Sequence, residues 1–242
     1  MGTDTGVFVG VWAAEFAEVL ASSEQMSASV YSVTGGTCSV IVGRVSFALG
    51  LQGPCISFDT ACSSGLVACY SAGRALQHVE CPLAIAGGVN MIFSPRMSAS
   101  MAAAGMTSPT GRCHTFDRRA DGYARGEACC AASLRCHDED APLLACGSAV
   151  RQDGRSASLT APNGLAQQGL LRASLEDARM LASDLSCAEA HGTGTALGDP
   201  IEAGSLAATV LSPAGASAAL GLGSGKANVG HAEPAAGATG ML

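Results

Sequence analysis

The sequence is poor in aromatic and charged residues, and what it lacks excludes several classes of function. Aromatic residues make up 4% and charged residues 14% of its 242 residues, and the formal net charge is −7. A negative chain of this kind argues against nucleic acid as a partner. Arg44 and Arg74 interrupt the longest apolar candidates, so no run approaches the roughly 20 residues that span a bilayer. The N-terminal residues lack a basic segment followed by an apolar core, so no signal peptide is expected.

The eleven cysteines have no spacing typical of a metal site or a disulfide framework. Their number is odd, no Cys-x-x-Cys pair occurs, and Cys129 and Cys130 are adjacent. Zinc ligands and secreted disulfide scaffolds normally show regular pairs. We therefore expect no metal, and reduced thiols in an intracellular compartment such as cytoplasm or plastid.

Strand and helix patterns alternate along the chain, which predicts an α/β fold. The low charge fraction and the 31 glycines suit buried parallel strands joined by close-packed loops. Predicted strands cover residues 5–10, 54–59, 83–90, 126–134, 142–152, 185–190 and 219–224. Predicted helices cover residues 12–21, 36–49, 63–78, 96–104, 163–180, 200–209 and 232–242, and residues 213–219 are expected to form a loop.

Cys62 is the most informative residue, because it lies where a predicted buried strand meets a predicted helix. That position predicts a cysteine on the first helical turn, where free N–H groups and the helix dipole favour a thiolate. Small neighbours, including Ala61 and Gly65, leave room for a substrate carbonyl. A buried structural cysteine is the competing interpretation.

Two histidines lie on loops that follow predicted strands, and they strengthen the catalytic interpretation of Cys62. His191 heads a loop rich in glycine and threonine, after which Asp199 is expected to cap a helix that has Pro200 in its first turn. His231 follows another apolar run and precedes a helix of small residues. Loops of this kind often carry catalytic groups.

Three long motifs around these residues resemble the β-ketoacyl synthase family, and most closely the ketosynthase domains of polyketide synthases. They are DTACSSGL around Cys62, EAHGTGTALGDPIEAGSL around His191 and GKANVGHAEPAAG around His231. The resemblance runs nearly end to end, and its further motifs are GRVSFALGLQGPCISFDTACSS, AGGVN at 86–90, GRCHTFDRRADGYARGE at 111–127 and QDGRSASLTAPNG at 152–164.

The resemblance implies a decarboxylative condensation in polyketide or fatty-acid synthesis. Cys62 would take an acyl chain from an acyl carrier protein thioester, and His191 and His231 would promote decarboxylation of a malonyl thioester. The enolate would then attack the acyl-Cys62 carbonyl. No cofactor is expected, because phosphopantetheine arrives on the carrier protein or CoA substrate. Which histidine also activates Cys62 is left open.

The neighbours of these motifs receive supporting roles from the same resemblance. The family's hydroxyls at Thr193 and Thr195 contact the pantetheine arm, and satisfying a tight loop is the alternative. A cation at Lys226 would disfavour protonation of nearby imidazoles. The acidic residues Asp199 and Glu202 are expected to cap the helix and pair with Lys226.

The family's fold implies a thiolase-like, duplicated α-β-α-β-α layered sandwich. We expect an N-terminal half over residues 1–145 that carries Cys62 and a C-terminal half over 146–242 that carries both histidines. The family's further segments at both ends, including a C-terminal phenylalanine gate, are not present, so the chain is expected to be a catalytic middle portion truncated at both ends.

Two interaction surfaces also follow from the resemblance. Family members pair as homodimers through the strand before the nucleophile, which here is residues 55–59. An acidic carrier protein needs a locally basic docking patch, for which Arg118, Arg119 and Arg125 are candidates, although an ordinary solvated cluster explains them as well.

Two other functions compete with the condensing enzyme. A thiolase-like thioester enzyme also pairs cysteine with histidine, but the GTGT string and the spacing from Lys226 to His231 favour a ketosynthase. A non-catalytic fragment or partner subunit is the other alternative. Retention of Cys62 argues against the partner type that lacks this cysteine, whereas truncation argues for a fragment.

Overall fold

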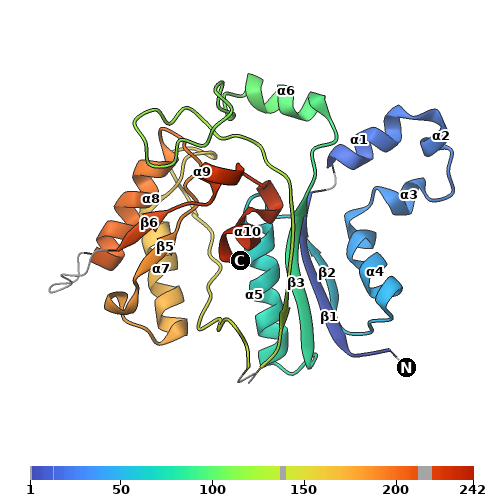
Figure 1. The fold of residues 1–242 in the computed structure, drawn as a ribbon, viewed down its shortest axis with the longest axis horizontal. Coiled ribbons are helices and arrows are strands. Elements are labelled where there is room, and N and C mark those ends of the chain that lie inside the picture. Colours follow the sequence, from blue (N-terminus) through green and yellow to red (C-terminus); the bar gives the residue numbers. More distant parts are fainter. Residues whose placement is uncertain (1, 13, 137–139, 212–219) are drawn as a thin grey trace. The chain divides into compact units, whose positions relative to one another are not determined.

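A computed structural model describes residues 2–12, 14–136, 140–211 and 220–242, and it confirms the predicted α/β class (Figure 1). The strands are β1 (Thr5–Val11), β2 (Cys55–Phe58), β3 (Leu83–Asn90), β4 (Ala128–Leu134), β5 (Cys187–Glu189) and β6 (Gly221–Gly223). The longer helices are α1 (Ala14–Ser22), α4 (Cys38–Leu49), α5 (Ser64–Gln77), α6 (Pro95–Ala103), α7 (Gly164–Ala178) and α8 (Gly198–Leu206). Short helices are α2 (Glu24–Ser27), α3 (Ser32–Gly35), α9 (Lys226–Val229), α10 (Ala236–Met241), η1 (Ala182–Asp184), η2 (Ala207–Leu211) and η3 (Glu233–Ala235).

The chain forms two compact units that interleave in sequence. Unit 1 comprises Met1–Ala104, Arg125–Glu139 and His231–Leu242, and unit 2 comprises Gly105–Ala124 and Asp140–Gly230. Unit 1 therefore contains Cys62 together with the C-terminal segment that carries His231, whereas His191 lies in unit 2.

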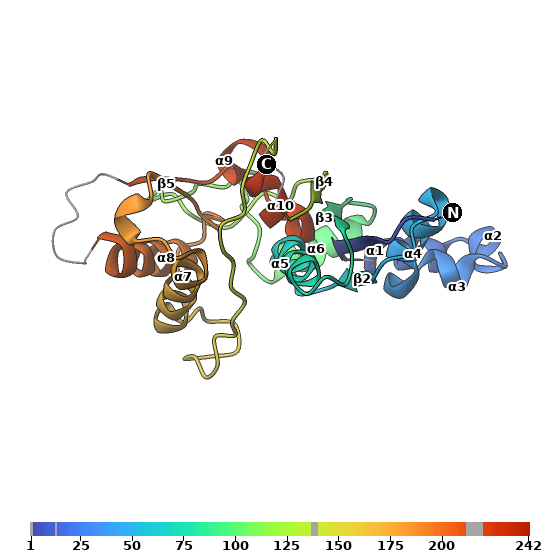
Figure 2. The same cartoon turned by 90° about the horizontal axis from the view of Figure 1, so that it is seen from below.

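Unit 1 is built on a four-stranded sheet in the order β2-β1-β3-β4. β1 is parallel to both β2 and β3, with Val7 opposite Cys55 and Ile85, and β4 is antiparallel to β3. The two ribbon views show α5 and α10 on one face of this sheet and α4 on the other (Figures 1 and 2). Because consecutive parallel strands need a crossover, α5 returns the chain from β2 to β3 across that face.

The core of unit 1 lies between α5 and the two central strands, and it is made mainly of small residues. Alanines three and four positions apart line one face of α5. They pack against Phe8 on β1 and against alanines on β3, and all of these side chains are buried. The cluster is Phe8, Ala68, Ala72, Ala75, Leu76, Cys81, Ala84 and Ala86. Small side chains on both surfaces let the helix axis approach the sheet closely, which holds the start of α5 in a defined position.

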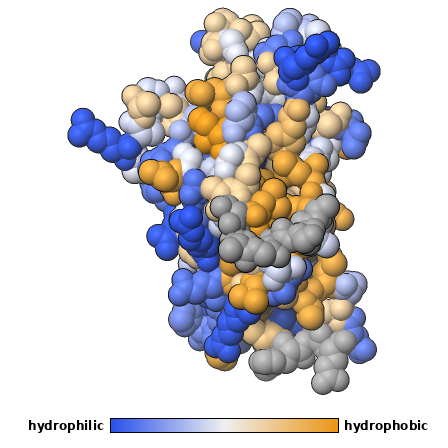
Figure 3. Space-filling view, turned by 90° about the vertical axis from the view of Figure 1, so that its left-hand side faces the viewer, coloured by the Kyte–Doolittle hydropathy of each residue, from blue (hydrophilic) through white to orange (hydrophobic). Residues whose placement is uncertain are grey.

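Unit 2 contains the parallel pair β5–β6 and the helices α7 and α8, and α8 continues directly into η2. Viewed from the side of α8 and the two strands, apolar side chains gather in the middle of the surface (Figure 3). The exposed apolar residues on or next to these elements include Leu197, Leu211 and Leu222, which are 40–58% exposed.

The structure also bears on membrane-spanning helices, disulfides and metal sites. Each helix within the described ranges is too short or too polar to cross a membrane. The eleven cysteines all lie in those ranges, and none of them forms a disulfide. In the same part of the chain, no group of three or more His, Cys, Asp or Glu side chains is arranged to hold a metal ion.

Two predicted elements differ from the structure. Residues 142–152 form no strand; Leu143 and Leu144 are exposed, and the amide of Ser148 donates to the Asp177 carboxylate instead of to a neighbouring strand. The predicted helix over 232–242 is split, because Pro234 lies in the 3-10 turn η3 before α10 begins. The loop expected over 213–219 lies outside the described residues.

Close packing at two glycines lets the C-terminal segment of unit 1 rest on the sheet and on α5, and a third glycine lets α5 rest on β1. A Cβ at Gly88 would lie 2.8 Å from Ala235 Cα and 2.9 Å from the carbonyl oxygen of Pro234. A Cβ at Gly65 would likewise lie 2.9 Å from that same oxygen, and one at Gly10 would overlap the Gly65 amide nitrogen. The segment after His231 therefore depends on the absence of side chains beneath it.

We predict that Gly88→Ala destabilises the chain by about 1–3 kcal/mol, because the added methyl overlaps backbone atoms that cannot rotate away. Gly73→Ala in α5 is the matched control. Its Cβ would meet nothing within 4 Å, so the substitution should stabilise the helix by about 0.5–1 kcal/mol. Thermal unfolding of both variants measures the effect, and equal shifts of Tm in the two would contradict the packing argument.

Candidate active site

Cys62 lies on a tight turn between β2 and α5, immediately before the Ser63 N-cap. The prediction placed it inside the first helical turn, and that is wrong, because the helix begins at Ser64, two residues after Cys62. The preceding residue, Ala61, has φ of 53°, so the chain reverses there in the left-handed region. Such strain in a non-glycine residue is often found at functional sites.

Ser64 stabilises this turn from beneath. Its hydroxyl accepts a hydrogen bond from the Thr60 amide at 2.8 Å and donates to the Ala61 carbonyl at 2.7 Å. The residue is fully buried against the sheet. The side chain thus closes the turn on both sides of Ala61 and holds the Cys62 thiol at the end of the strand.

His231 lies within hydrogen-bond distance of the Cys62 thiol. The two residues are 169 positions apart, and His231 Nε2 is 3.0 Å from Cys62 Sγ. The residue is 1% exposed, and the Glu233 backbone N–H donates to its ring Nδ1 at 3.1 Å. A nitrogen that accepts an N–H must present a lone pair, so we assign the ring proton to Nε2, which faces the sulfur.

A buried ion-pair network adjoins His231 through Glu233. Arg125 donates from Nε to Glu233 Oε1 at 2.7 Å and from Nη2 to Glu233 Oε2 at 2.8 Å, which is a bidentate pair. The same guanidinium donates to Glu15 and, from Nη1, to Ser98 Oγ at 2.8 Å. The Arg125 side chain is only 6% exposed, so the fork is almost completely enclosed by its partners.

The pKa values in this network follow from its hydrogen bonds. The hydrogen bonds that Arg125 donates to Glu233 are the largest cause that raises the pKa of Arg125 above its usual range. Burial opposes this increase, and the hydrogen bond that Arg125 donates to Glu15 adds to it. Burial alone would raise the pKa of Glu15, but the amides of Ser94 and Phe93 and the Arg125 guanidinium outweigh it. Its pKa is therefore lowered, and the network carries charges of both signs at neutral pH.

In unit 2, His191 lies on the loop after β5, and Glu202 on α8 holds that loop. Glu202 Oε1 accepts from the His191 amide at 2.6 Å, and its Oε2 accepts from the Gly192 amide at 2.8 Å. Gly192 and Gly194 have positive φ values of 46° and 79°. The carboxylate therefore fixes a backbone bend that glycine makes accessible.

Asp199 holds the rest of the same loop. Its Oδ1 accepts from the amides of Gly194 and Thr195 at 3.1 and 3.2 Å, and its Oδ2 accepts from the Phe116 amide at 2.8 Å. The residue lies in the first turn of α8, which begins at Gly198 and not at Pro200. The predicted cap of this helix is therefore wrong, since the carboxylate binds the preceding loop and the 113–116 segment.

The pKa of His191 is lowered below its usual value. Desolvation of the ring is the largest cause and the positive charge of Lys226 is the second, while Glu202 and Asp199 act in the opposite direction. Lys226 is itself 7% exposed, so its charge acts through little water. The lowered pKa favours the neutral imidazole of His191 at pH 7, although the residue as a whole is exposed.

Thr193 and Thr195 lie in this loop between the histidine and α8. Thr193 is buried, its hydroxyl is 3.4 Å from that of Thr195, and the Gly198 amide donates to Thr195 Oγ1 at 3.2 Å. These contacts are those of a closed loop, and a role in binding pantetheine stays a prediction.

The structure brings the predicted site residues together in two groups. Unit 1 joins Cys62 to His231, and unit 2 joins His191 to the side chains that surround it. The second group comprises His191, Thr193, Thr195, Asp199, Glu202 and Lys226. The division predicted at residue 145 stays a prediction.

Sequence reasoning missed Glu233 and Glu15, and it misplaced Arg125. Arg125 was a candidate for a carrier docking patch, but its side chain is buried in ion pairs and is not available at the surface. Arg119 is paired with Asp117 at 2.8 Å. The nearest signal for Glu233 is its position two residues after a candidate catalytic histidine.

Two family models match the chain and together cover nearly all of it. Residues 1–139 match the β-ketoacyl synthase N-terminal domain, and residues 144–242 match the β-ketoacyl synthase C-terminal domain. Both matches agree with the resemblance carried by the motifs around Cys62, His191 and His231.

Relatives among known proteins are parts of polyketide synthases. The chain is 44% identical over all its length to one component of the phenolphthiocerol/phthiocerol polyketide synthase of Mycobacterium tuberculosis H37Rv. It is also 44% identical, over 98% of its length, to a second component of the same synthase from that strain. The chain spans 11% and 13% of these two relatives.

Solved structures of ketosynthases share the fold. The ketosynthase from module 6 of the bacillaene synthase from Bacillus subtilis 168 superposes on 99% of the chain with a TM-score of 0.83 and 33% identity. An oxazolomycin ketosynthase domain from Streptomyces albus JA3453 superposes on 98% with a TM-score of 0.85 and 32% identity. The chain covers 42% of each of these structures. The thiolase-like prediction is confirmed, and the chain belongs to the β-ketoacyl synthase family as a ketosynthase of the polyketide synthase type.

Proposed function

We propose that the chain catalyses decarboxylative Claisen condensation in polyketide assembly, with Cys62 as the nucleophile. The observation that carries the proposal is the 3.0 Å contact between His231 Nε2 and Cys62 Sγ on a strained turn before α5. An N–H that faces the sulfur stabilises a thiolate, and a thiolate is both a strong nucleophile and a good leaving group.

In the first half-reaction, the Cys62 thiolate attacks the carbonyl of an acyl thioester. A new carbon–sulfur bond forms at Cys62 and the old one breaks, which releases the thiol of the phosphopantetheine arm. An acyl carrier protein is the proposed donor, and Thr193 and Thr195 are proposed to contact that arm. The acyl group then remains on Cys62 as a thioester.

In the second half-reaction, a malonyl thioester loses carbon dioxide. The electron pair of the broken carbon–carbon bond stays on the thioester and forms an enolate. Neutral imidazole N–H groups stabilise the oxygen of that enolate as its charge develops. The Nε2–H of His231 and the neutral ring of His191 suit this task, and Lys226 helps to keep His191 unprotonated. The enolate carbon then bonds to the acyl carbonyl carbon, and the Cys62 thiolate leaves.

Intact-protein mass spectrometry tests this function. An acyl thioester should add one acyl group to the chain, and peptide mapping should place it on Cys62. In His231→Ala, some acylation should remain, slowed by the loss of the N–H that faces the sulfur. Decarboxylation of malonyl thioester should fall about 10²- to 10³-fold, because the enolate loses a preorganised donor. Carbon dioxide release measures the second rate.

His78→Ala is the control for this experiment, because His78 is exposed at the C-cap of α5. It should decarboxylate at the parent rate, and Cys62→Ala should not be acylated. Acylation of another cysteine, or a parent decarboxylation rate in His231→Ala, would refute the proposed roles.

The charge of Lys226 should set the acid limit of decarboxylation. Because Lys226 lowers the pKa of His191, the neutral ring persists below the usual titration range of histidine. Lys226→Met keeps the side-chain volume but removes the charge, so the pKa of His191 rises and the rate should be lost at a higher pH. A pH–rate profile of decarboxylation measures the shift.

Arg172→Met is the matched control, because it removes a positive charge from an exposed position on α7. Its profile should coincide with that of the parent chain. An unchanged acid limb in Lys226→Met would show that His191 protonation does not limit the reaction.

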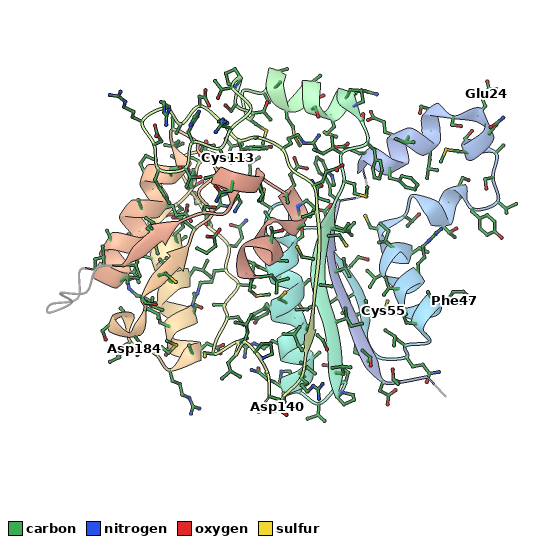
Figure 4. The ribbon with its side chains drawn as sticks, viewed as in Figure 1. Glu24, Phe47, Cys55, Cys113, Asp140 and Asp184 are labelled. Carbon is green, nitrogen blue, oxygen red and sulfur yellow. The ribbon has the colours of Figure 1, made fainter. Side chains whose placement is uncertain are left out.

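We also propose a homodimer formed through β2. This strand is an edge of the unit 1 sheet, and Ile56 on it is 44% exposed. On the neighbouring α4, Phe47 is 91% exposed and points away from the sheet (Figure 4). An unpaired apolar edge of this kind favours pairing with another strand.

Sedimentation velocity should show a dimer at micromolar concentration. Ile56→Lys should shift the chain toward monomer, because a twofold axis through β2 brings the two charges near each other. Leu165→Lys, at a residue 78% exposed on α7, is the control and should leave the dimer intact. A well-folded parent monomer across the concentration range would contradict the proposal.

A further inference from the structure

The Arg125 network contacts the segment that carries His231 on two sides, and the chemistry proposed above does not use it. The main chain at Arg125 forms a bridge with that of His231, and the next amide, of Gly126, donates to the His231 carbonyl at 2.8 Å. The side chain of Arg125 holds both carboxylate oxygens of Glu233. Arg125 therefore contacts the backbone of His231 and also contacts Glu233, whose amide donates to the His231 ring.

Glu233 adopts a conformation that its own backbone disfavours. Its φ is 46°, in the left-handed region that side chains other than glycine seldom occupy, and Pro234 further restricts it. In this conformation, the Glu233 N–H points at His231 Nδ1. A strained residue keeps such a conformation only where its surroundings hold it.

The fork of Arg125 is the interaction that holds the side chain of Glu233. Glu233 is 4% exposed and both its carboxylate oxygens are occupied by Arg125. A planar guanidinium fixes the direction of a carboxylate as well as its distance, which a single ammonium cannot do. Rotation of the Glu233 backbone would break both hydrogen bonds inside a buried site.

We propose that Arg125 is a positioning residue which, through its bidentate pair with Glu233, fixes the proton of His231 on Nε2 opposite Cys62. Without the fork, Glu233 can relax to negative φ, and its N–H leaves Nδ1. The ring proton is then free to occupy Nδ1, and Nε2 presents a lone pair to the sulfur. Because the inference concerns the same Cys62–His231 pair as the proposed function, it rests on that function for its catalytic meaning, although its test does not require condensation.

Two carboxylates on the same guanidinium provide a matched comparison. Glu15→Gln and Glu233→Gln each remove one negative charge from the Arg125 site, and both residues are about equally buried. Glu15 also accepts from the amides of Phe93 and Ser94, far from the ring of His231 in sequence. A role limited to stability predicts similar effects for the two variants, whereas a positioning role predicts an effect on the ring for Glu233→Gln alone.

The experiment measures the tautomer of His231 by ¹⁵N–¹H correlation across its imidazole ring in the 242-residue chain, with His231→Gln used to assign its signals. In the parent, we expect the proton on Nε2 and a lone pair on Nδ1. Glu233→Gln and Arg125→Lys should add the Nδ1–H form, and Glu15→Gln should retain the parent pattern. The rate of Cys62 alkylation by iodoacetamide should fall about tenfold in the first two variants, because the thiolate loses a charge-assisted hydrogen bond.

Two kinds of outcome overturn the positioning proposal. A parent tautomer in Glu233→Gln and Arg125→Lys would show that the fork does not position the ring. The same change in Glu15→Gln, or a change seen only where the thermal transition is lost, would show that the network acts through stability. Failure of acyl transfer with the predicted tautomer changes intact would refute the proposed function and leave the positioning role standing.

Discussion

Everything at the candidate site of unit 1 depends on how closely the segment after His231 approaches the sheet. That approach requires bare backbone at Gly65 and Gly88, because a methyl group at either position would overlap the carbonyl oxygen of Pro234. Gly10 similarly lets the start of α5 rest on β1. The small core residues of α5 serve the same purpose, so packing along the helix and the geometry at Cys62 have one cause.

The structure supports its two histidines by different physical means. At His231, a backbone N–H occupies one ring nitrogen, so hydrogen-bond geometry decides where the proton lies. At His191, desolvation and the charge of Lys226 decide whether the ring is protonated at all, against the opposing carboxylates of Asp199 and Glu202. Salt screens a charge effect of the kind that Lys226 exerts on His191, whereas it has little direct effect on a buried backbone hydrogen bond such as that to His231.

The parts of the fold that the sequence predicts are those with strong local patterns. The range of β3 matches the prediction, and α5 begins one residue later than expected, because alternating apolar residues and a helical stripe are visible in the sequence itself. Residues 142–152 are apolar enough for a strand but pair with no strand among the described residues. Pairing depends on distant parts of the chain, so the local sequence could not predict this. Cys62, His191 and His231 were found because long motifs surround them.

Arg125 shows why the remaining part of the site was not predictable. In the sequence it stands near Arg118 and Arg119 and has the composition of a solvated basic patch. Its partners Glu15 and Glu233 are 110 and 108 positions away, and only the folded chain brings them to the guanidinium. Burial changes the expected role of Arg125 from a surface contact to an internal one, because a buried charge must be paired. Its bidentate pairing then fixes the orientation of the Glu233 carboxylate. A basic residue within a run of basic side chains can therefore be fully paired inside the protein, and through that pairing it can orient a backbone amide, as we propose for Arg125.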